Sequence, residues 1–177
     1  MSTIELVPRI ETRRLALRAP TQADAGRIAA LANDFDIARM TTRMPHPYGL
    51  ADAEAFIAGV QAADPAREAV FAIELEDEGV VGAIGLHPGG VLGSEIGYWI
   101  GRPYWGRGLA SEAARAALDW AGDAWGRRAV VAGYFADNPA SGRVLERAGF
   151  LHTGEVQQRL SLARGEAAPT RMMVWLA

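Results

Sequence analysis

The segment from Gly101 to Ala113 holds residue types that could bind a phosphate group. It reads Gly-Arg-Pro-Tyr-Trp-Gly-Arg-Gly-Leu-Ala-Ser-Glu-Ala and leads into the longest helix that the sequence predicts. Small residues at Gly106, Gly108 and Ala110 let a ligand approach the backbone closely. The first amides of a helix lack partners within it, and the helix dipole adds positive potential there. Together these features predict a site for a pyrophosphate group.

Other interpretations of the glycines differ in what else they require. A dinucleotide-binding turn would need a third small residue at Ser111 and an acidic residue about 20 positions later, where Arg127 and Arg128 stand. A P-loop needs a lysine, and all 18 basic residues of the chain are arginine. A plain helix start with tight packing would explain the glycines without any ligand.

Few side chains are suited to acid–base or covalent chemistry. Glu95 is a carboxylate in an otherwise apolar run and is the candidate general base, although an exposed carboxylate at a strand end is nearly as ordinary. The chain has no cysteine, so a thiol nucleophile and a thiolate metal site are excluded. The absence of lysine excludes Schiff-base chemistry. His46, His87 and His152 are scattered without metal-ligand spacing, and we infer no metal site.

The elements that must position these residues follow from hydrophobic periodicity and turn signals. We expect strands at 15–18, 70–75, 80–86, 94–100, 129–135, 155–162 and 170–176. We expect helices at 21–33, 51–61, 109–125 and 140–148, with an irregular proline-containing loop at 41–49 and a polar turn between the last two strands. An antiparallel hairpin followed by a crossover helix and a strand predicts an α/β fold, with a mixed sheet and helices on its faces.

Length and composition limit the organisation and the partners. The 177 residues fit a single domain, 1–177, and half of them are hydrophobic, as in ordinary globular proteins. The net charge of −3 and the lack of a run of like charges argue against nucleic acid or a membrane as partner. The N-terminal stretch lacks the apolar segment of a signal peptide, so we expect a cytoplasmic protein. Exposed apolar sheet edges would suit a homodimer.

Five stretches of the chain resemble the GNAT acetyltransferase superfamily, and within it the Rim-type group of ribosomal-protein N-terminal acetyltransferases. They occur in family order across nearly the whole chain. They are Glu11-Thr-Arg-Arg-Leu-Ala-Leu-Arg18, Met44-Pro-His-Pro-Tyr48, Glu95-Ile-Gly-Tyr-Trp-Ile100, Tyr104-Trp-Gly-Arg-Gly-Leu-Ala-Ser-Glu-Ala113, and Asn138-Pro-Ala-Ser141 with Leu145-Glu-Arg-Ala-Gly-Phe150. Trp105 departs from the Gln or Arg of the broad superfamily motif, but the Rim-type group commonly has an aromatic pair there.

This resemblance implies a mostly antiparallel central sheet with helices on both faces and a splayed strand pair that holds acetyl-CoA. Trp99 and Ile100 on the splayed strand would pair with the pantetheine amides, and Asn138 and Ser141 would border the pantetheine. The residues expected to form the pyrophosphate loop are Gly106, Arg107, Gly108, Leu109, Ala110 and Ser111. A simple helix-entry turn remains the other interpretation of the segment that begins at Asn138.

The resemblance also implies the reaction. The chain would transfer an acetyl group from acetyl-CoA to a primary amine by direct attack in a ternary complex, with Glu95 as base and Ser141 as hydrogen-bond donor to the departing sulfur. Tyr98 and Tyr134 are other candidate donors, but strand alternation puts Tyr98 on the face opposite Glu95. The Rim-type group implies a protein N-terminal α-amine as acceptor. A small-molecule amine or amino acid, or a non-catalytic CoA-binding module, remains the alternative.

Overall fold

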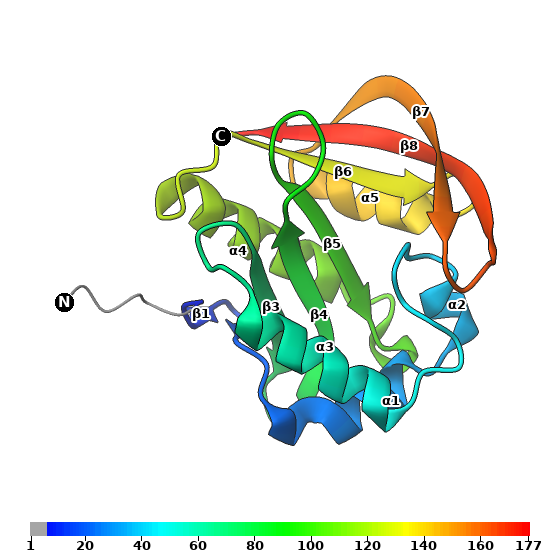
Figure 1. Ribbon diagram of the computed structural model, residues 1–177. Coiled ribbons are helices and arrows are strands. Elements are labelled where there is room, and N and C mark those ends of the chain that lie inside the picture. Colours follow the sequence, from blue (N-terminus) through cyan, green and yellow to red (C-terminus); the bar gives the residue numbers. More distant parts are fainter. Residues whose placement is uncertain (1–6) are drawn as a thin grey trace.

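One eight-stranded sheet forms the centre of the molecule (Figure 1). The computed structural model describes residues 7–177. The strand order is β1-β2-β3-β4-β5-β6-β8-β7. The strands are β1 (Ile10–Glu11), β2 (Leu15–Arg18), β3 (Ala69–Leu75), β4 (Gly79–His87), β5 (Glu95–Ile100), β6 (Ala129–Phe135), β7 (Leu151–Ser161) and β8 (Glu166–Leu176). Every neighbouring pair is antiparallel except β5 and β6, which run parallel.

The parallel pair is joined at one end only. Glu95 and Val131 are partners in register, and the Val131 amide donates to the Ser94 carbonyl at 2.9 Å. Beyond this point β5 stays paired with β4, while β6 follows β8. The two strands therefore splay, which leaves β5 without a strand partner on its inner edge from Gly97 to Ile100.

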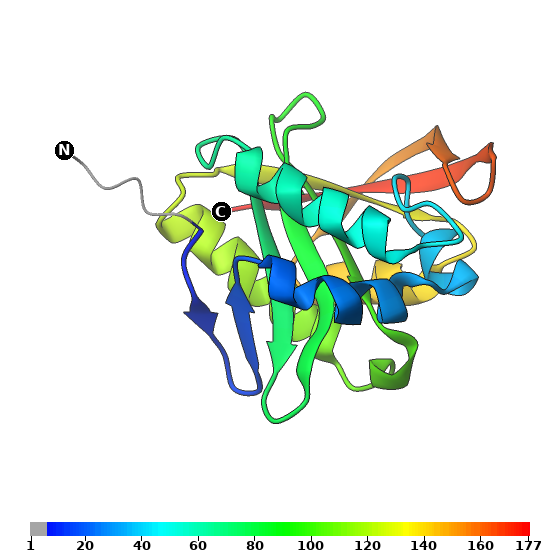
Figure 2. The same cartoon turned by 60° about the horizontal axis from the view of Figure 1, so that its bottom comes forward.

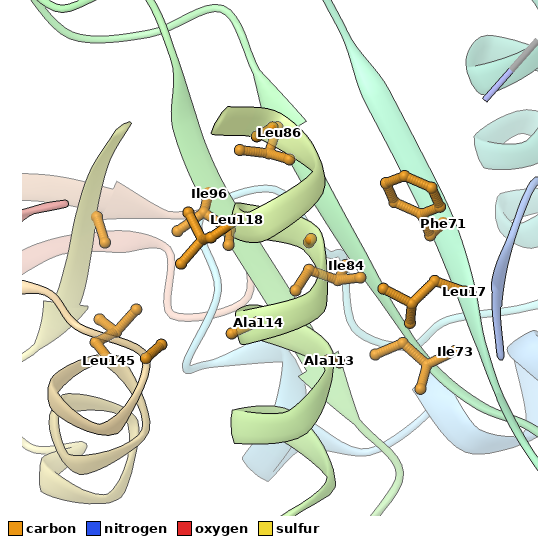
Figure 3. Packing of buried hydrophobic residues seen from close by; sticks show 14 of the residues in the cluster. Leu17, Phe71, Ile73, Ile84, Leu86, Ile96, Ala113, Ala114, Leu118 and Leu145 are labelled. Carbon is orange, nitrogen blue, oxygen red and sulfur yellow. The ribbon is translucent and has the colours of Figure 1, made fainter. Parts of the chain in front are cut away.

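Helices cover both faces of the sheet (Figure 2). They are α1 (Ala25–Ala32), α2 (Phe35–Ala38), α3 (Leu50–Ala62), α4 (Leu109–Asp123) and α5 (Pro139–Arg147), with single 3₁₀ turns at Gln22–Asp24 and Arg102–Tyr104. Helices α4 and α5 pack in the larger core, with side chains such as Phe71, Leu118 and Leu145 (Figure 3). Helices α1 and α3 pack in a second core on Ile28, Ile57 and Val80.

Most elements expected from the sequence are confirmed, with bounds that differ by a few residues. The short strand β1 was not predicted, because two residues are too few to show an alternation. Helix α2 was also missed; Asp34 caps it by accepting from the Asp36 amide at 2.9 Å. The turn between the last two strands is shorter than expected, because β8 begins before Pro169. This proline pairs with Gln158 of β7, at a point where β6 has already ended on the other side of β8.

Candidate active site

A cavity of about 890 Å³ opens beside the splayed strands. Its floor is formed by β4 and β5, and its walls come from the loop between α2 and α3, from α3, from α5 and from the tips of β7 and β8. Of the residues expected at the site, Glu95, Trp99 and Ser141 line this cavity. Ile100, Asn138 and the loop from Gly106 to Ser111 lie outside it.

The glycine loop forms the N-terminus of α4. Gly108 is the residue before the helix and has φ +74°, and Gly106 has the same φ, a conformation that favours glycine. Within residues 7–177 we find no acceptor for the amides of Leu109, Ala110 and Ser111. These free donors at a helix start are suited to a pyrophosphate.

Arg14 and Glu112 hold this loop against the edge of the sheet. The Arg14 guanidinium donates to the Arg107 carbonyl at 2.8 Å and to Glu112 at 2.7 Å, and the Arg14 amide donates to the same carboxylate at 2.8 Å. Thr12 Oγ1 adds a hydrogen bond of 2.7 Å. Although burial opposes ionisation of Glu112, these hydrogen bonds outweigh it and lower its pKa. The loop is therefore fixed before any ligand binds.

Tyr98 and Ser141 meet across the splay. The Tyr98 hydroxyl lies 2.7 Å from Ser141 Oγ and 3.3 Å from the Ser141 carbonyl oxygen. Burial raises the pKa of Tyr98 to about 12, so the phenol keeps its proton. As strand alternation predicts, Tyr98 packs in the core of α4 and α5, whereas Trp99 packs in that of α1 and α3. Tyr98 nevertheless reaches the cavity, because the splay opens the sheet between the two faces.

Glu95 is not a free carboxylate. Arg159 of β7 donates to both of its oxygens, the longer contact being 3.3 Å from Nη2 to Oε2. Both side chains are about a quarter exposed, and both line the cavity. Arg159 was not predicted from the sequence, because 64 positions separate it from Glu95 and no local pattern connects them.

His87 is a second titratable group that the sequence analysis left without a role. It is the partner of Glu95 in the register of β4 and β5, and its Nδ1 lies 3.3 Å from Glu68 Oε1. All three side chains line the cavity. The signal was present in the sequence, because a hairpin closed by residues 88–94 places His87 opposite Glu95.

Asn138 and Ile100 have local structural roles. The Asn138 side chain accepts from the Ser141 amide at 3.4 Å and so caps α5, as expected of a helix-entry turn. The Ile100 carbonyl accepts from the indole of Trp105 at 2.6 Å. Trp105, at the position where the residue type departs from the broad family motif, thus braces the loop that precedes α4.

The fit of these residues to acetyl-CoA rests on two features of the backbone. The free amides at the start of α4 match a pyrophosphate, and the unpaired edge of β5 offers hydrogen-bonding groups to an amide-bearing chain. Apart from its two chain neighbours, no atom of the described residues lies within 4 Å of the position that a Cβ at Gly106 would take, so the loop has an open face. The arrangement is that of a CoA-binding acyltransferase.

The comparisons with known proteins agree with this class. The family model described as acetyltransferase (GNAT) domain matches residues 14–151, and the chain belongs to this family. The uncharacterised N-acetyltransferase YoaA of Bacillus subtilis is 30% identical over 163 residues, which are 86% of this chain and 88% of that protein. The chain is therefore an acyl-CoA N-acyltransferase.

Two solved structures show how widely the fold is shared. The ribosomal-protein-S5-alanine acetyltransferase of Vibrio fischeri superposes with a TM-score of 0.80 at 18% identity, covering 96% of each chain. The spermidine N-acetyltransferase of Vibrio cholerae, in complex with CoA and spermine, gives a TM-score of 0.77 at 20% identity, covering 93% of this chain and 96% of that one. These likenesses confirm the α/β fold with its mostly antiparallel sheet.

Residues 7–177 contain neither a candidate membrane span nor a candidate metal site. No helix there is long and apolar enough to cross a membrane. No group of three or more His, Cys, Asp or Glu side chains in that range is arranged to hold a metal ion.

Proposed function

We propose that the chain acetylates the α-amine of a protein or peptide N-terminus by direct attack in a ternary complex. The observation that carries the proposal is the large cavity at the splay, which is lined both by the carboxylate Glu95 and by the Tyr98–Ser141 pair. When bound, acetyl-CoA supplies the thioester that the amine attacks. An α-amine has a pKa of about 7.7–8.0, so a modest proton acceptor suffices near neutral pH.

The proposed proton transfers use side chains that line the cavity. Glu95 accepts a proton from the acceptor ammonium group, whose positive charge its carboxylate attracts. Ser141 Oγ donates a hydrogen bond to the departing sulfur, and Tyr98, which stays protonated, donates in turn to Ser141 Oγ. The amides from Arg107 to Ser111 bind the pyrophosphate. The edge of β5 beside Trp99 and Ile100, which has no neighbouring strand, pairs with the pantetheine.

The acceptor class has one alternative that a specific observation favours. The relative of known structure from Vibrio cholerae is a spermidine N-acetyltransferase, and this cavity contains the carboxylates Asp52, Glu68 and Glu95, which suit a polyamine or another small cation. The Vibrio fischeri structure, by contrast, is an acetyltransferase of a ribosomal-protein alanine. The shared fold does not choose between these acceptors.

The testing experiment measures acetyl-CoA consumption over a panel of amines. The panel contains four kinds of amine. The first is a hexapeptide with a free N-terminal alanine. The second is the same hexapeptide with its α-amine formylated and with one internal lysine as its only free amine. The others are spermidine and free amino acids. We expect turnover of the free hexapeptide and none of the formylated one. Turnover of only spermidine or the amino acids would show that the acceptor is a small molecule and not a peptide N-terminus. Binding of acetyl-CoA without any turnover would indicate a non-catalytic module.

We also propose a homodimer through the outer strand of the sheet. Strand β7 is one of the two edge strands, and Val156, Leu160 and Leu162 in or beside it are more than half exposed. Exposed apolar side chains on an edge strand favour pairing with another chain. Light scattering after size-exclusion chromatography should give twice the chain mass, and a Leu160→Lys variant should give the chain mass alone.

A further inference from the structure

A row of three titratable side chains crosses the floor of the cavity. Glu95 of β5 and His87 of β4 are partners in register, so their side chains stand side by side on one face, with Cβ atoms about 5 Å apart in such pairs. Glu68 directly precedes β3, whose residue Ala69 pairs with Leu86, and its carboxylate lies 3.3 Å from His87 Nδ1. Arg159 closes the row beyond Glu95.

The imidazole of His87 is placed by a glycine. A Cβ on Gly85 would lie 2.6 Å from His87 Nε2, so the ring folds over Gly85 and fills the space that a side chain would take. Gly97 is the register partner of Gly85 on β5, and both glycines line the cavity. The ring therefore has Nδ1 toward Glu68, while Nε2 lies above this glycine floor.

The surroundings of His87 keep it neutral at rest and able to take up a proton. Burial lowers its pKa most, and the charge of Arg43 lowers it further. Glu68 and Glu95 oppose these effects, since each carboxylate favours the imidazolium form. Nδ1 is buried without a well-aligned hydrogen bond among the described residues, so protonation of the ring would strengthen its contact with Glu68.

Glu95 is poorly suited to retain a proton itself. Both of its oxygens already accept from Arg159, and a proton on either oxygen would compete with the guanidinium. A carboxylate held in this way can pass a proton on to a nearby base. The partner of Glu95 in the register of β4 and β5 is His87, whose imidazole is neutral at rest.

We propose that His87 is the final acceptor of the proton that the substrate amine loses, that Glu95 transfers it, and that Glu68 is a positioning residue that orients the ring. The inference rests on the proposed N-acetyltransferase function and deepens it. The ammonium group gives one proton to Glu95, which passes it to His87 Nε2 and becomes a carboxylate again. The free amine forms the C–N bond as the C–S bond breaks. Its second proton balances the thiolate as CoA thiol, and His87 releases the first proton to solvent.

The test compares His87→Gln with His152→Gln over a range of pH. His152 is the matched control, because it also lies beside a carboxylate, Glu146 at 2.8 Å, but does not line the cavity. With the alanine hexapeptide as acceptor, the ratio of wild-type to His87→Gln rate should reach at least 10-fold. The ratio should be bell-shaped, falling below the pKa of His87, where the ring is already protonated, and above about pH 8, where the amine is already free. His152→Gln should follow the wild type.

A second readout does not depend on turnover. The imidazole resonances, assigned by loss of one set in His87→Gln, give the pKa of His87 directly. This pKa should decrease in both Glu68→Gln and Glu95→Gln. In the wild type it should equal the pH at which the ratio of wild-type to His87→Gln rate falls on the acidic side. Acetyl-CoA affinity measured by calorimetry should be unchanged in all three variants.

The outcomes separate the two proposals. The proposed proton transfer to His87 is overturned if the pH–rate profile of His87→Gln runs parallel to that of the wild type, or if Glu95→Gln leaves the pKa of His87 unchanged. Either result would still be compatible with the proposed acetyltransferase function. Failure of the wild type to turn over any amine overturns the proposed function, and the transfer with it.

Discussion

The hydroxyl of Tyr98 lies 2.7 Å from Oγ of Ser141 and joins β5 to the first turn of α5 across the splay. Two hydroxyls in series can supply a hydrogen bond to a developing thiolate without either losing its proton to solvent. Because burial raises the pKa of Tyr98 to about 12, this donor is present throughout the neutral and moderately alkaline range.

Removal of the serine hydroxyl should slow the departure of the sulfur. We expect Ser141→Ala to lower kcat by about 10-fold or more, with acetyl-CoA affinity kept. Raising the pH should not rescue it, because the defect lies in the leaving group, whereas an acetyl thioester of a more acidic thiol should restore part of the rate. Tyr98→Phe should behave in the same way. Equal losses for both thioesters in Ser141→Ala would show that the hydroxyl has no role at the sulfur.

Glu95→Gln should fail differently. We expect kcat near neutral pH to fall by roughly 10²-fold, with acetyl-CoA affinity little changed. Raising the pH should partly restore the rate, because the fraction of free amine rises without help from the enzyme, and more so for an α-amine than for lysine. Glu146→Gln, which removes a carboxylate outside the cavity, is the control. A wild-type rate and pH profile in Glu95→Gln would make the carboxylate purely structural.

The glycine loop can be tested with two glycines in the same conformation. Gly106 has φ +74° and Gly126 has φ +72°, and in residues 7–177 a Cβ at either position would meet no atom within 4 Å beyond its chain neighbours. Valine should therefore cost each site a similar strain, about 1–2 kcal/mol. Only Gly106→Val should also weaken acetyl-CoA binding, by 10-fold or more in calorimetry, because only that loop is proposed to hold the pyrophosphate. Equal affinities in the two variants would remove this assignment.

Local patterns of the sequence were enough to predict most of the fold. The alternation of β3, β4 and β5 and the helical spacing of α4 each depend on a short window, and the structure has these elements within a few residues of the expected bounds. The site was predicted less completely. Glu95 and Ser141 were identified singly, but their partners Arg159 and Tyr98 are 64 and 43 positions away.

The Glu95–Arg159 and Tyr98–Ser141 pairs form because β6 separates from β5 and pairs with β8. This strand pairing brings α5 and the end of β7 to the cavity, and no local sequence pattern predicts it. His87 is an intermediate case, since its register with Glu95 follows from the hairpin but its contact with Glu68 depends on the neighbouring strand.

The ion pair between Arg18 and Asp24, the residue before α1, should make the free energy of unfolding depend on pH. Arg18 donates to both oxygens of Asp24 at 2.9 Å and also pairs with Glu74. The hydrogen bonds from Arg18 lower the pKa of Asp24. The stabilisation is therefore present above the unfolded-state pKa of about 3.9 and is lost as the pH falls through the folded-state pKa. Asp24→Asn should cost about 2 kcal/mol at pH 7 in urea unfolding. The difference in the free energy of unfolding between the wild type and Asp24→Asn should become smaller at pH 3. If this difference stayed constant, the ion pair would not be its cause.

Arg164 connects the turn between β7 and β8 to the loop after α2. Its guanidinium donates two hydrogen bonds of 2.8 Å to Asp137 and one of 2.6 Å to the Arg39 carbonyl, and it lies 4.4 Å from the centre of the Phe135 ring. Nearby, the Leu162 amide donates to the Thr42 carbonyl at 3.0 Å. The turn between β7 and β8 thereby holds the loop after α2, which forms one wall of the cavity.

Arg164→Met keeps the aliphatic stem but removes these hydrogen bonds, so the loop should loosen while the acetyl-CoA side stays intact. We expect KM for the acceptor to rise several-fold, acetyl-CoA affinity to be unchanged, and stability to fall by about 1–3 kcal/mol. The pKa of Asp137, which the Arg164 hydrogen bonds lower, should return toward its ordinary value. Arg128→Met, at an exposed residue outside the cavity, controls for loss of charge. An unchanged acceptor KM beside the expected loss of stability would show that Arg164 supports the fold and does not shape the acceptor site.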